Sequence, residues 1–316
     1  MTTVVEIANM LLGGIAAGMV LFIVSVGLSV TMGLMGFVNL AHGGFAMIGG
    51  YVTVALLRKW EWTINLRFST RWFSLDLGSF SIIKPFEIPL LPSLLFAAVL
   101  VGLASIVLER TLYRRLYRAT ELDQVLFTIG LVFVLISLVT LIVGPENQSI
   151  SLPEWLQGQI NLGITHYRTY SVALILVGTA MVVALWLGFE RTRTGAQIRA
   201  AVDNRRMAES LGINIGRLFT ITFAFGSGMA ALGGGLGAEF LGLDPQYPLK
   251  YLVLFLIVVA VGGLGRITGV FYAALIIGVL DFVLKKYLPQ GGTVFIYALT
   301  ILLLLWRPQG LFGGKA

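Results

Sequence analysis

The chain has 316 residues, of which 57% are hydrophobic and 12% are charged, and its mean hydropathy is +0.91. Soluble domains carry about 25% charged residues, so this composition excludes an ordinary soluble protein and indicates an integral membrane protein. The formal net charge of +7 comes from basic residues in the segments beside apolar runs. Basic residues in such places set membrane orientation, so we expect contact with membrane lipid and no nucleic acid partner.

Charge-free apolar runs recur along the chain and predict its membrane-spanning helices. A helix crosses the bilayer in about 20 residues, and long unbroken runs indicate helices and not barrel strands. The runs cover residues 7–57, 88–108, 124–145, 169–189, 218–238, 251–265, 267–280 and 287–306. Because the first run holds two helices, the sequence predicts an all-α, polytopic membrane protein with about eight or nine spans. These spans form a single transmembrane domain, 1–316.

Two of these runs, 251–265 and 267–280, are short and interrupted by glycine. We expect their helices to be tilted, broken or longer than the charge-free part. The first ten residues lack the basic flank of a secretory signal, so we expect them to be kept as part of the first span.

A basic insert at residues 190–217 contains six arginines and three acidic residues, and it lies between two charge-free runs. Because a central arginine in a bilayer costs roughly 2.5–3.5 kcal/mol, this insert must lie in water. If it is cytoplasmic, alternation places residues 109–123 and the carboxyl terminus on the same side. The amino terminus then lies outside, and the number of crossings is odd.

Residues 58–90 form an extracytoplasmic loop in this topology. Apolar and polar residues alternate over 62–83, which predicts two short strands joined near Asp76 and Gly78 as a β-hairpin. An aromatic-rich loop lying at the lipid headgroups is the alternative.

The basic insert itself predicts two short helices. Gly195 to Val202 forms the first, and Arg205 to Leu211 forms the second, which is capped by Asp203 or Asn204 and ended by Gly212. Met207, Ala208 and Leu211 fall on one face of the second helix. Such an apolar ridge between arginines suits a groove in another protein, whereas the alternative is a solvated loop that only fixes orientation.

The segment 39–51, NLAHGGFAMIGGY, places polar residues and glycines inside the long first run. Glycine pairs allow a helix to break near the bilayer midplane, where transporter sites commonly lie. We therefore predict that Asn39, His42, Gly43 and Gly44 line a substrate pathway. The alternative is that the two polar side chains hydrogen-bond neighbouring helices and the glycines only pack.

Other glycine clusters, at 233–237 and 262–269, are expected to be helix-packing seams. Asp281 lies inside a late apolar run, but Lys285 follows it by four residues on the same helical face. We therefore expect a local ion pair there, and the alternative is a proton relay.

Enzymatic activity has no support in the residues. The chain has only two histidines, no cysteine, and no H-E-x-x-H, nucleophile-elbow or Walker A pattern. We expect no catalytic residue, no metal site and no ATP hydrolysis by this chain.

Several long stretches, in this order, resemble the permease subunits of ABC importers of the branched-chain amino acid (Liv) type. These stretches are GLSVTMGLMGFVNLAHGGFAMIGGY at 27–51, the ER…LYR pattern at 109–118, residues 191–234, residues 261–280 and RPQGLFG at 307–313. The likeness covers most of the chain. The segment 58–90 is longer than in the family's common pattern, which leaves the substrate and the binding-protein contact open.

The resemblance implies that residues 191–216 are a cytoplasmic coupling loop that docks on an ATPase subunit. The coupling residues expected from it are Arg193, Gly195, Arg199, Asp203, Asn204, Arg206, Met207, Ala208, Leu211 and Gly212. It also implies a second homologous permease subunit as heterodimer partner, two ATP-binding subunits that hold ATP and magnesium, and an extracytoplasmic solute-binding protein. This chain would bind no cofactor, and it would lie in a bacterial cytoplasmic (inner) membrane.

The substrate expected from the resemblance is a branched-chain or other amino acid. Urea or short amides and aromatic acids are alternatives within the same importer class. A rival interpretation is an ion-coupled secondary transporter that uses His42 or Asp281. An intramembrane enzyme built on His42 lacks both a nucleophile and metal ligands.

Overall fold

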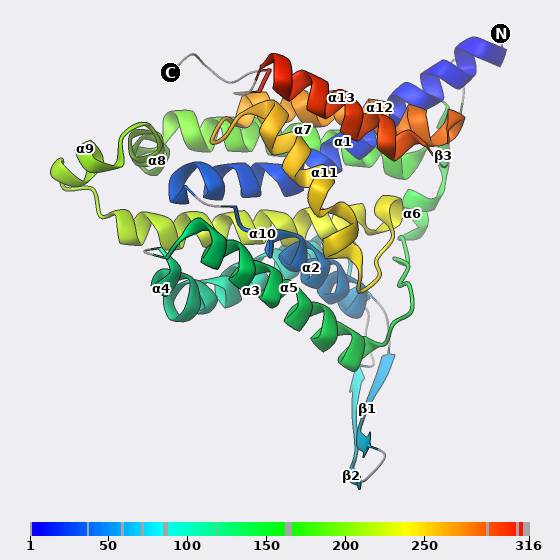
Figure 1. The fold of residues 1–316 in the computed structure, drawn as a ribbon. Coiled ribbons are helices and arrows are strands. Elements are labelled where there is room, and N and C mark those ends of the chain that lie inside the picture. Colours follow the sequence, from blue (N-terminus) through cyan, green and yellow to red (C-terminus); the bar gives the residue numbers. More distant parts are fainter. Residues whose placement is uncertain are drawn as a thin grey trace.

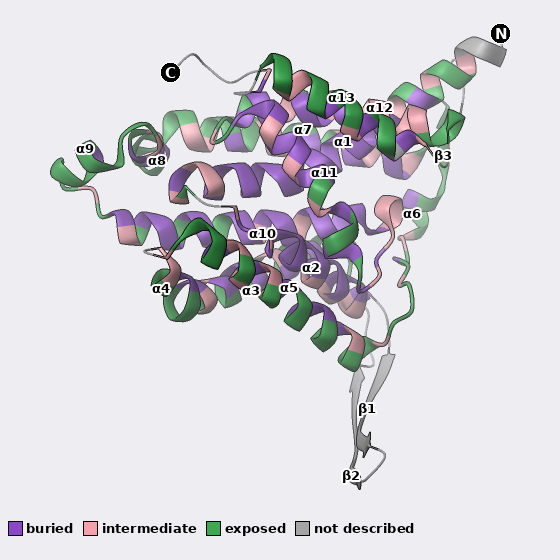
Figure 2. Cartoon of the chain, viewed as in Figure 1, coloured by how far each residue is buried: buried purple, intermediate pink, exposed green. Residues whose placement is uncertain are grey.

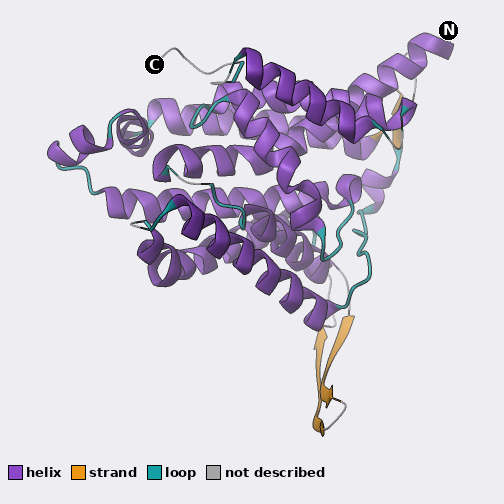
Figure 3. Cartoon of the chain, viewed as in Figure 1, coloured by secondary structure: helices purple, strands orange, loops and turns teal. Residues whose placement is uncertain are grey.

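The computed structural model describes residues 2–36, 38–57, 60–70, 73–84, 88–117, 119–161, 166–288, 291–307 and 310–311, without side-chain detail at 2–4, 60–84 and Thr293. Helices form most of this part of the chain, and its strands occur only in connecting segments (Figure 3). The first half contains α1 (Thr2–Met35), α2 (His42–Leu57), β1 (Trp60–Thr70), β2 (Phe73–Lys84), α3 (Leu90–Leu108), the π-helical turn η1 (Glu109–Tyr113), α4 (Arg114–Leu116) and α5 (Glu121–Val143).

The second half begins with a short connecting region and continues with six apolar or amphipathic helices and one short one. Its elements are α6 (Glu154–Gln157), β3 (Gln159–Asn161), β4 (His166–Arg168), α7 (Thr169–Arg191), α8 (Arg193–Asp203), α9 (Arg205–Ser210), α10 (Ile215–Leu241), α11 (Tyr247–Gly262), α12 (Ile267–Tyr287) and α13 (Gly292–Trp306).

Six of the described helices are long and apolar enough to cross a membrane, and three shorter apolar helices accompany them. The long ones span Val5–Met35, Leu90–Leu116, Glu121–Val143, Thr169–Arg191, Ile215–Leu241 and Ile267–Tyr287, and the shorter ones span His42–Leu57, Tyr247–Gly262 and Val294–Trp306. These nine helices confirm the predicted all-α, polytopic membrane architecture. As expected, α12 extends beyond its charge-free run, and it continues to Tyr287.

Helix α1 lies at the centre of the bundle, where it packs against α7, α10, α11 and α12 (Figure 1). Its most apolar window is 78% buried, whereas the corresponding windows of α5 and α7 are 22% and 17% buried. The outer helices therefore expose apolar side chains along their length (Figure 2). This distribution suits a chain whose surroundings are lipid tails.

Small residues set the closest helix contacts. A Cβ on Gly27 of α1 would come within 2.5 Å of the Gly226 carbonyl oxygen of α10. Between α2 and α10, a Cβ on Gly49 would overlap Ala231, and one on Gly234 would overlap the carbonyl oxygen of Ala46. Small residues let backbones approach in this way, which confirms the predicted packing role for glycines of the 233–237 cluster.

The chain between α1 and α2 re-enters the bundle before it becomes helical again. Gly36 has φ +75°, and Nε2 of His42, the first residue of α2, lies 2.9 Å from the carbonyl oxygen of Val24. Val24 precedes the end of α1 by eleven residues, which corresponds to about 16 Å along a helix axis. α2 therefore begins beside the interior of α1, about three helical turns from its end.

A two-stranded antiparallel hairpin, β1 and β2, occupies the loop after α2. The expected joint near Asp76 and Gly78 is wrong, because the register runs out to Thr70 opposite Phe73 and Asp76 pairs with Arg67. The register shifts between Asn65 and Arg67, opposite the stretch that contains Gly78. Glycine is common at such bulges, and the sequence pattern took this bulge for the turn.

The two ends of the bundle carry different elements. The α8–α9 loop and α4 lie at one end, and the hairpin, α6 and the start of α1 lie at the other (Figure 1). The basic insert and the 109–123 connection therefore share one side, as alternation of the spans predicts. The first turns of α1 and the last turn of α13 lie toward opposite ends.

Candidate functional site

The predicted coupling loop, residues 191–216, contains two short helices, α8 and α9, held by capping side chains. The Thr192 side chain accepts a hydrogen bond from the backbone N–H of Gly195 at 3.1 Å, and Asn204 Oδ1 accepts one from the N–H of Met207 at 3.0 Å. Asn204, and not Asp203, is thus the cap of the second helix. Gly212 ends this helix with φ +82°, a conformation that favours glycine.

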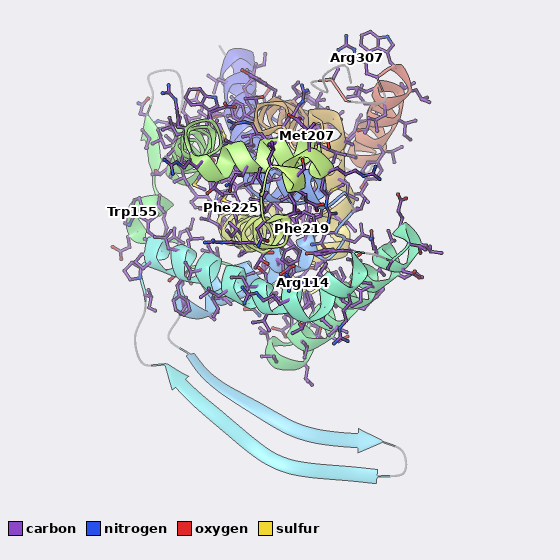
Figure 4. All side chains as sticks on the ribbon, turned by 90° about the vertical axis from the view of Figure 1, so that its left-hand side faces the viewer. Arg114, Trp155, Met207, Phe219, Phe225 and Arg307 are labelled. Atoms are coloured by element: carbon purple, nitrogen blue, oxygen red, sulfur yellow. The ribbon has the colours of Figure 1, made fainter. Side chains whose placement is uncertain are left out.

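Two apolar side chains of this loop face away from the protein. Met207 is 59% exposed and Leu211 is 73% exposed. Figure 4 looks onto this end of the bundle and shows Met207 on α9 at its outer face. The other predicted coupling residues that are exposed are Arg193, Asp203, Asn204, Arg206 and Gly212. An apolar pair ringed by charged side chains has the composition of a protein-binding surface.

Three predicted coupling residues support the loop from within. Ala208 is only 1% exposed, so the expectation that it shares an exposed ridge with Met207 and Leu211 is wrong. The side chain of Ala208 packs among the buried residues of the hydrophobic core. Gly195 is buried and lies so close to Phe189 that a Cβ would overlap its backbone. The Arg199 guanidinium donates a hydrogen bond to the Phe189 carbonyl oxygen. These contacts fix α8 on the end of α7.

Asn39 and His42 are both buried, at 2% and 1% exposure. Asn39 Oδ1 accepts hydrogen bonds from the Ala41 N–H at 3.2 Å and from the Tyr113 hydroxyl at 3.0 Å. His42 Nε2 hydrogen-bonds the Val24 carbonyl oxygen. Both side chains therefore join the re-entrant segment to neighbouring helices in this conformation.

Gly43 and Gly44 lie against neighbouring helices. A Cβ on Gly43 would come 3.1 Å from Cα of Pro248 in α11, and a Cβ on Gly44 would come 2.7 Å from Cδ1 of Leu135 in α5. The four predicted pathway residues thus lie together at the start of α2. They pack closely where α2 meets α1, α5 and α11.

Glu109 was not predicted as a functional residue, and its carboxylate is fully buried at the start of η1. Its Oε1 accepts from the Tyr117 hydroxyl at 2.7 Å, and its Oε2 lies 2.7 Å from Thr220 Oγ1 of α10. Burial raises the pKa of the Tyr117 hydroxyl, and so does its hydrogen bond to Glu109, so the phenol stays a proton donor. The sequence signals were the position of Glu109 at the edge of an apolar run and its place in the ER…LYR pattern.

A second polar group was also missed, at the opposite end of the bundle. Asp244 follows α10 and forms an ion pair with Lys250 at 3.6 Å. The hydroxyls of Tyr51 and Tyr247 and Oδ1 of Asp244 are buried without a hydrogen-bond partner in the described part of the chain. Buried polar atoms of this kind call for a water or a ligand.

Asp281 is 8% exposed, and its carboxylate forms an ion pair with Lys285 at 2.7 Å. This confirms the predicted i to i+4 pair. The carboxylate is thus neutralised locally.

Comparison with known proteins gives a consistent family. The family model for the branched-chain amino acid transport system / permease component matches residues 10–304. The chain is 27% identical to the high-affinity branched-chain amino acid transport system permease protein LivH of Salmonella typhimurium, over 95% of this chain and 93% of that protein. It is also 27% identical to the permease protein BraD of Pseudomonas aeruginosa, named for the same kind of system, over 96% and 94%.

A shorter match links the chain to another transporter. It is 36% identical to the tyrosine transport system permease protein of Clostridioides difficile, over 23% of this chain and 25% of that protein. No solved structure matches the chain. The matched residues extend from α1 into α13, so the chain belongs to the permease-component family of branched-chain amino acid transport systems.

Proposed function

We propose that this chain is the membrane-spanning permease subunit of an ATP-driven ABC importer of a small polar solute. It acts as a transport subunit, and ATP with magnesium is bound and hydrolysed by partner subunits. The coupling loop carries this proposal, because it presents Met207 and Leu211 to the outside on a rigid, capped frame. Family membership supports the assignment.

The proposed complex contains a second homologous permease subunit, two ATP-binding subunits and an extracytoplasmic solute-binding protein. It lies in a bacterial cytoplasmic membrane with α8 and α9 on the cytoplasmic side. The outward-facing apolar surfaces of α5 and α7 support contact with lipid or with the second permease.

The proposed mechanism begins at the coupling loop, which joins α7 to α10 directly. Closure of the ATPases moves this loop and with it the near end of α10. Helix α10 packs closely on α2 through Gly234 and Ala46. Movement of α10 therefore shifts the start of α2, where Asn39, His42, Gly43 and Gly44 then open or close the pathway.

For the solute we propose a free amino acid, with branched-chain amino acids first. The names of the relatives support this choice. The pair of Asp244 and Lys250 also supports it, because two opposite charges complement an ammonium and a carboxylate. Urea or short amides lack this charge pattern, and aromatic amino acids share it.

Reconstitution tests the proposal. The importer is assembled with its partners in proteoliposomes, and uptake of leucine and ATP hydrolysis are both measured. Replacing Asp203 and Arg206 by alanine should reduce assembly or solute-stimulated hydrolysis, since both side chains are exposed on the loop. Full assembly and full stimulation would contradict docking at this loop. Uptake that persists without any ATPase subunit would favour an ion-coupled transporter.

A further inference from the structure

The carboxylate of Glu109 is buried at the start of η1, between Tyr117 and Thr220 of α10. Its exposure is 0%, and no lysine or arginine of the described chain forms an ion pair with it. The oxygens of a buried carboxylate need hydrogen-bond partners. Tyr117 and Thr220 provide those bonds, one on each oxygen.

One arm of this arrangement reaches the coupling loop. The Tyr117 ring packs edge-on against the Phe219 ring with centroids 5.0 Å apart. The guanidinium carbon of Arg205, the first residue of α9, lies 5.0 Å from the centroid of the same Phe219 ring. Figure 4 shows Phe219 between α9, which carries Met207, and the helix that carries Arg114. Displacement of α9 therefore acts directly on the residue that positions Tyr117.

The other arm reaches the re-entrant segment. Tyr113 ends the same π-helical turn, and its exposure is 0%. Its hydroxyl donates to Asn39 Oδ1 at 3.0 Å, and its ring lies 4.7 Å from that of Phe223 in α10. Asn39 Oδ1 also holds the Ala41 N–H at the start of α2. The π turn thus contacts the segment that begins the predicted pathway.

We propose that η1 transmits movement of the coupling loop to the start of α2, and that Glu109 is the positioning residue that holds this turn on α10. The inference rests on the proposed function. Phe219 and Thr220 are adjacent on α10, so a displacement of α9 changes two contacts together. These are the ring contact of Phe219 with Tyr117 and the hydrogen bond of Thr220 to Glu109. Tyr113 then carries the change to Asn39.

The π-helical form of η1 provides a physical reason for two states. A π turn contains one residue more than the α-helix requires, and such turns occur mostly at functional sites. When the extra residue moves into the neighbouring helix, the side chains of the turn rotate by about 100° per residue about the axis. Such a rotation would break or form the Tyr113–Asn39 hydrogen bond, and the bonds of Glu109 select which register is populated.

The test uses the complete importer in proteoliposomes, with leucine as the transported probe. Tyr117→Phe removes one donor to Glu109 but keeps the ring on Phe219, and Thr220→Val removes the other donor at nearly constant volume. Thr300→Val is the matched control, because Thr300 is a buried threonine whose hydroxyl donates to the Ile296 carbonyl oxygen of its own helix. Leucine imported per ATP hydrolysed is measured beside the amount of assembled complex.

We expect both variants to hydrolyse ATP at the wild-type rate and to import at least about fivefold less leucine per ATP, whereas the control keeps the wild-type ratio. A purely structural role would lower assembly, uptake and hydrolysis together and leave their ratio unchanged. Wild-type ratios in Tyr117→Phe and Thr220→Val would overturn the inference.

Glu109→Gln is a third variant. It should lower the import per ATP like the other two, because the amide nitrogen replaces one of the two carboxylate oxygens that accept hydrogen bonds. If this variant does not assemble, the two milder variants decide. Failure of the proposed function is distinguishable, since wild-type importer would then take up leucine without ATP. In that case there is no ATP ratio to measure.

Discussion

The hydroxyl of Tyr113 donates to Oδ1 of Asn39 across 3.0 Å and joins the end of η1 to the chain that enters α2. The two residues are 74 positions apart in the sequence, and both are buried. This bond links η1, at the end of α3 that lies on the side of the α8–α9 loop, with the start of α2. It shows how a distant element can position the predicted pathway.

Tyr113→Phe removes this hydrogen bond and keeps the ring. We expect a loss of about 1 kcal/mol of stability, because Asn39 Oδ1 retains the Ala41 N–H. Leucine uptake should fall more than the amount of folded protein. Thermal unfolding and uptake measure the two effects, and Tyr287→Phe, at a side chain 62% exposed, is the control. Unchanged uptake would exclude a role of the Tyr113 hydroxyl in transport.

Met207→Ala combined with Leu211→Ala should weaken ATPase binding. The two side chains are exposed apolar groups at the tip of the loop, where a few residues commonly supply most of the binding energy. We expect at least about tenfold weaker association, measured by co-purification at graded ATPase concentrations. Leu122→Ala is the matched control, because Leu122 is 67% exposed at the same end of the bundle but outside the loop. Equal binding by both variants would contradict the prediction.

Gly234→Ala tests the contact between α2 and α10. The added methyl would overlap the Ala46 carbonyl oxygen, and forced overpacking typically costs about 1–3 kcal/mol. We expect lower thermal stability and loss of uptake. Gly130→Ala is the control, because nothing lies within 4 Å of a Cβ at that position of α5. The control should be neutral or slightly stabilising, since alanine favours helix.

Asp244→Asn tests the proposed amino acid specificity. If Asp244 binds the substrate ammonium, its loss should raise the KM for leucine at least about tenfold, because a hydrogen bond to a charged group contributes about 1.5–3 kcal/mol. Glu154→Gln removes one charge from the exposed helix α6 at the same end and is the control. An unchanged KM in Asp244→Asn would exclude this residue from substrate binding.

The helical architecture could be predicted because the bilayer imposes simple rules. Charge-free length located the nine apolar helices, and the Gly and Asn positions of the coupling loop located α8 and α9. Both signals are local, so a single sequence contains them. The same holds for the pair of Asp281 and Lys285.

Features that depend on tertiary contacts could not be predicted. The inward position of Ala208 follows from how α9 sits on the bundle, and not from the helical face alone. The hairpin turn was misplaced because Gly78 marks a bulge and a turn equally well. The contacts of Glu109 join residues 8 and 111 positions apart, and only the fold brings Thr220 to it.

Site-specific labelling of Met207 tests the central claim most directly. The chain has no cysteine, so Met207→Cys places a unique thiol on the exposed face of α9. We predict that a membrane-impermeant maleimide labels it only from the cytoplasmic side, and only after the ATPase subunits are removed. Labelling from the exterior, or undiminished labelling in the intact importer, would contradict an ATPase docked on this loop.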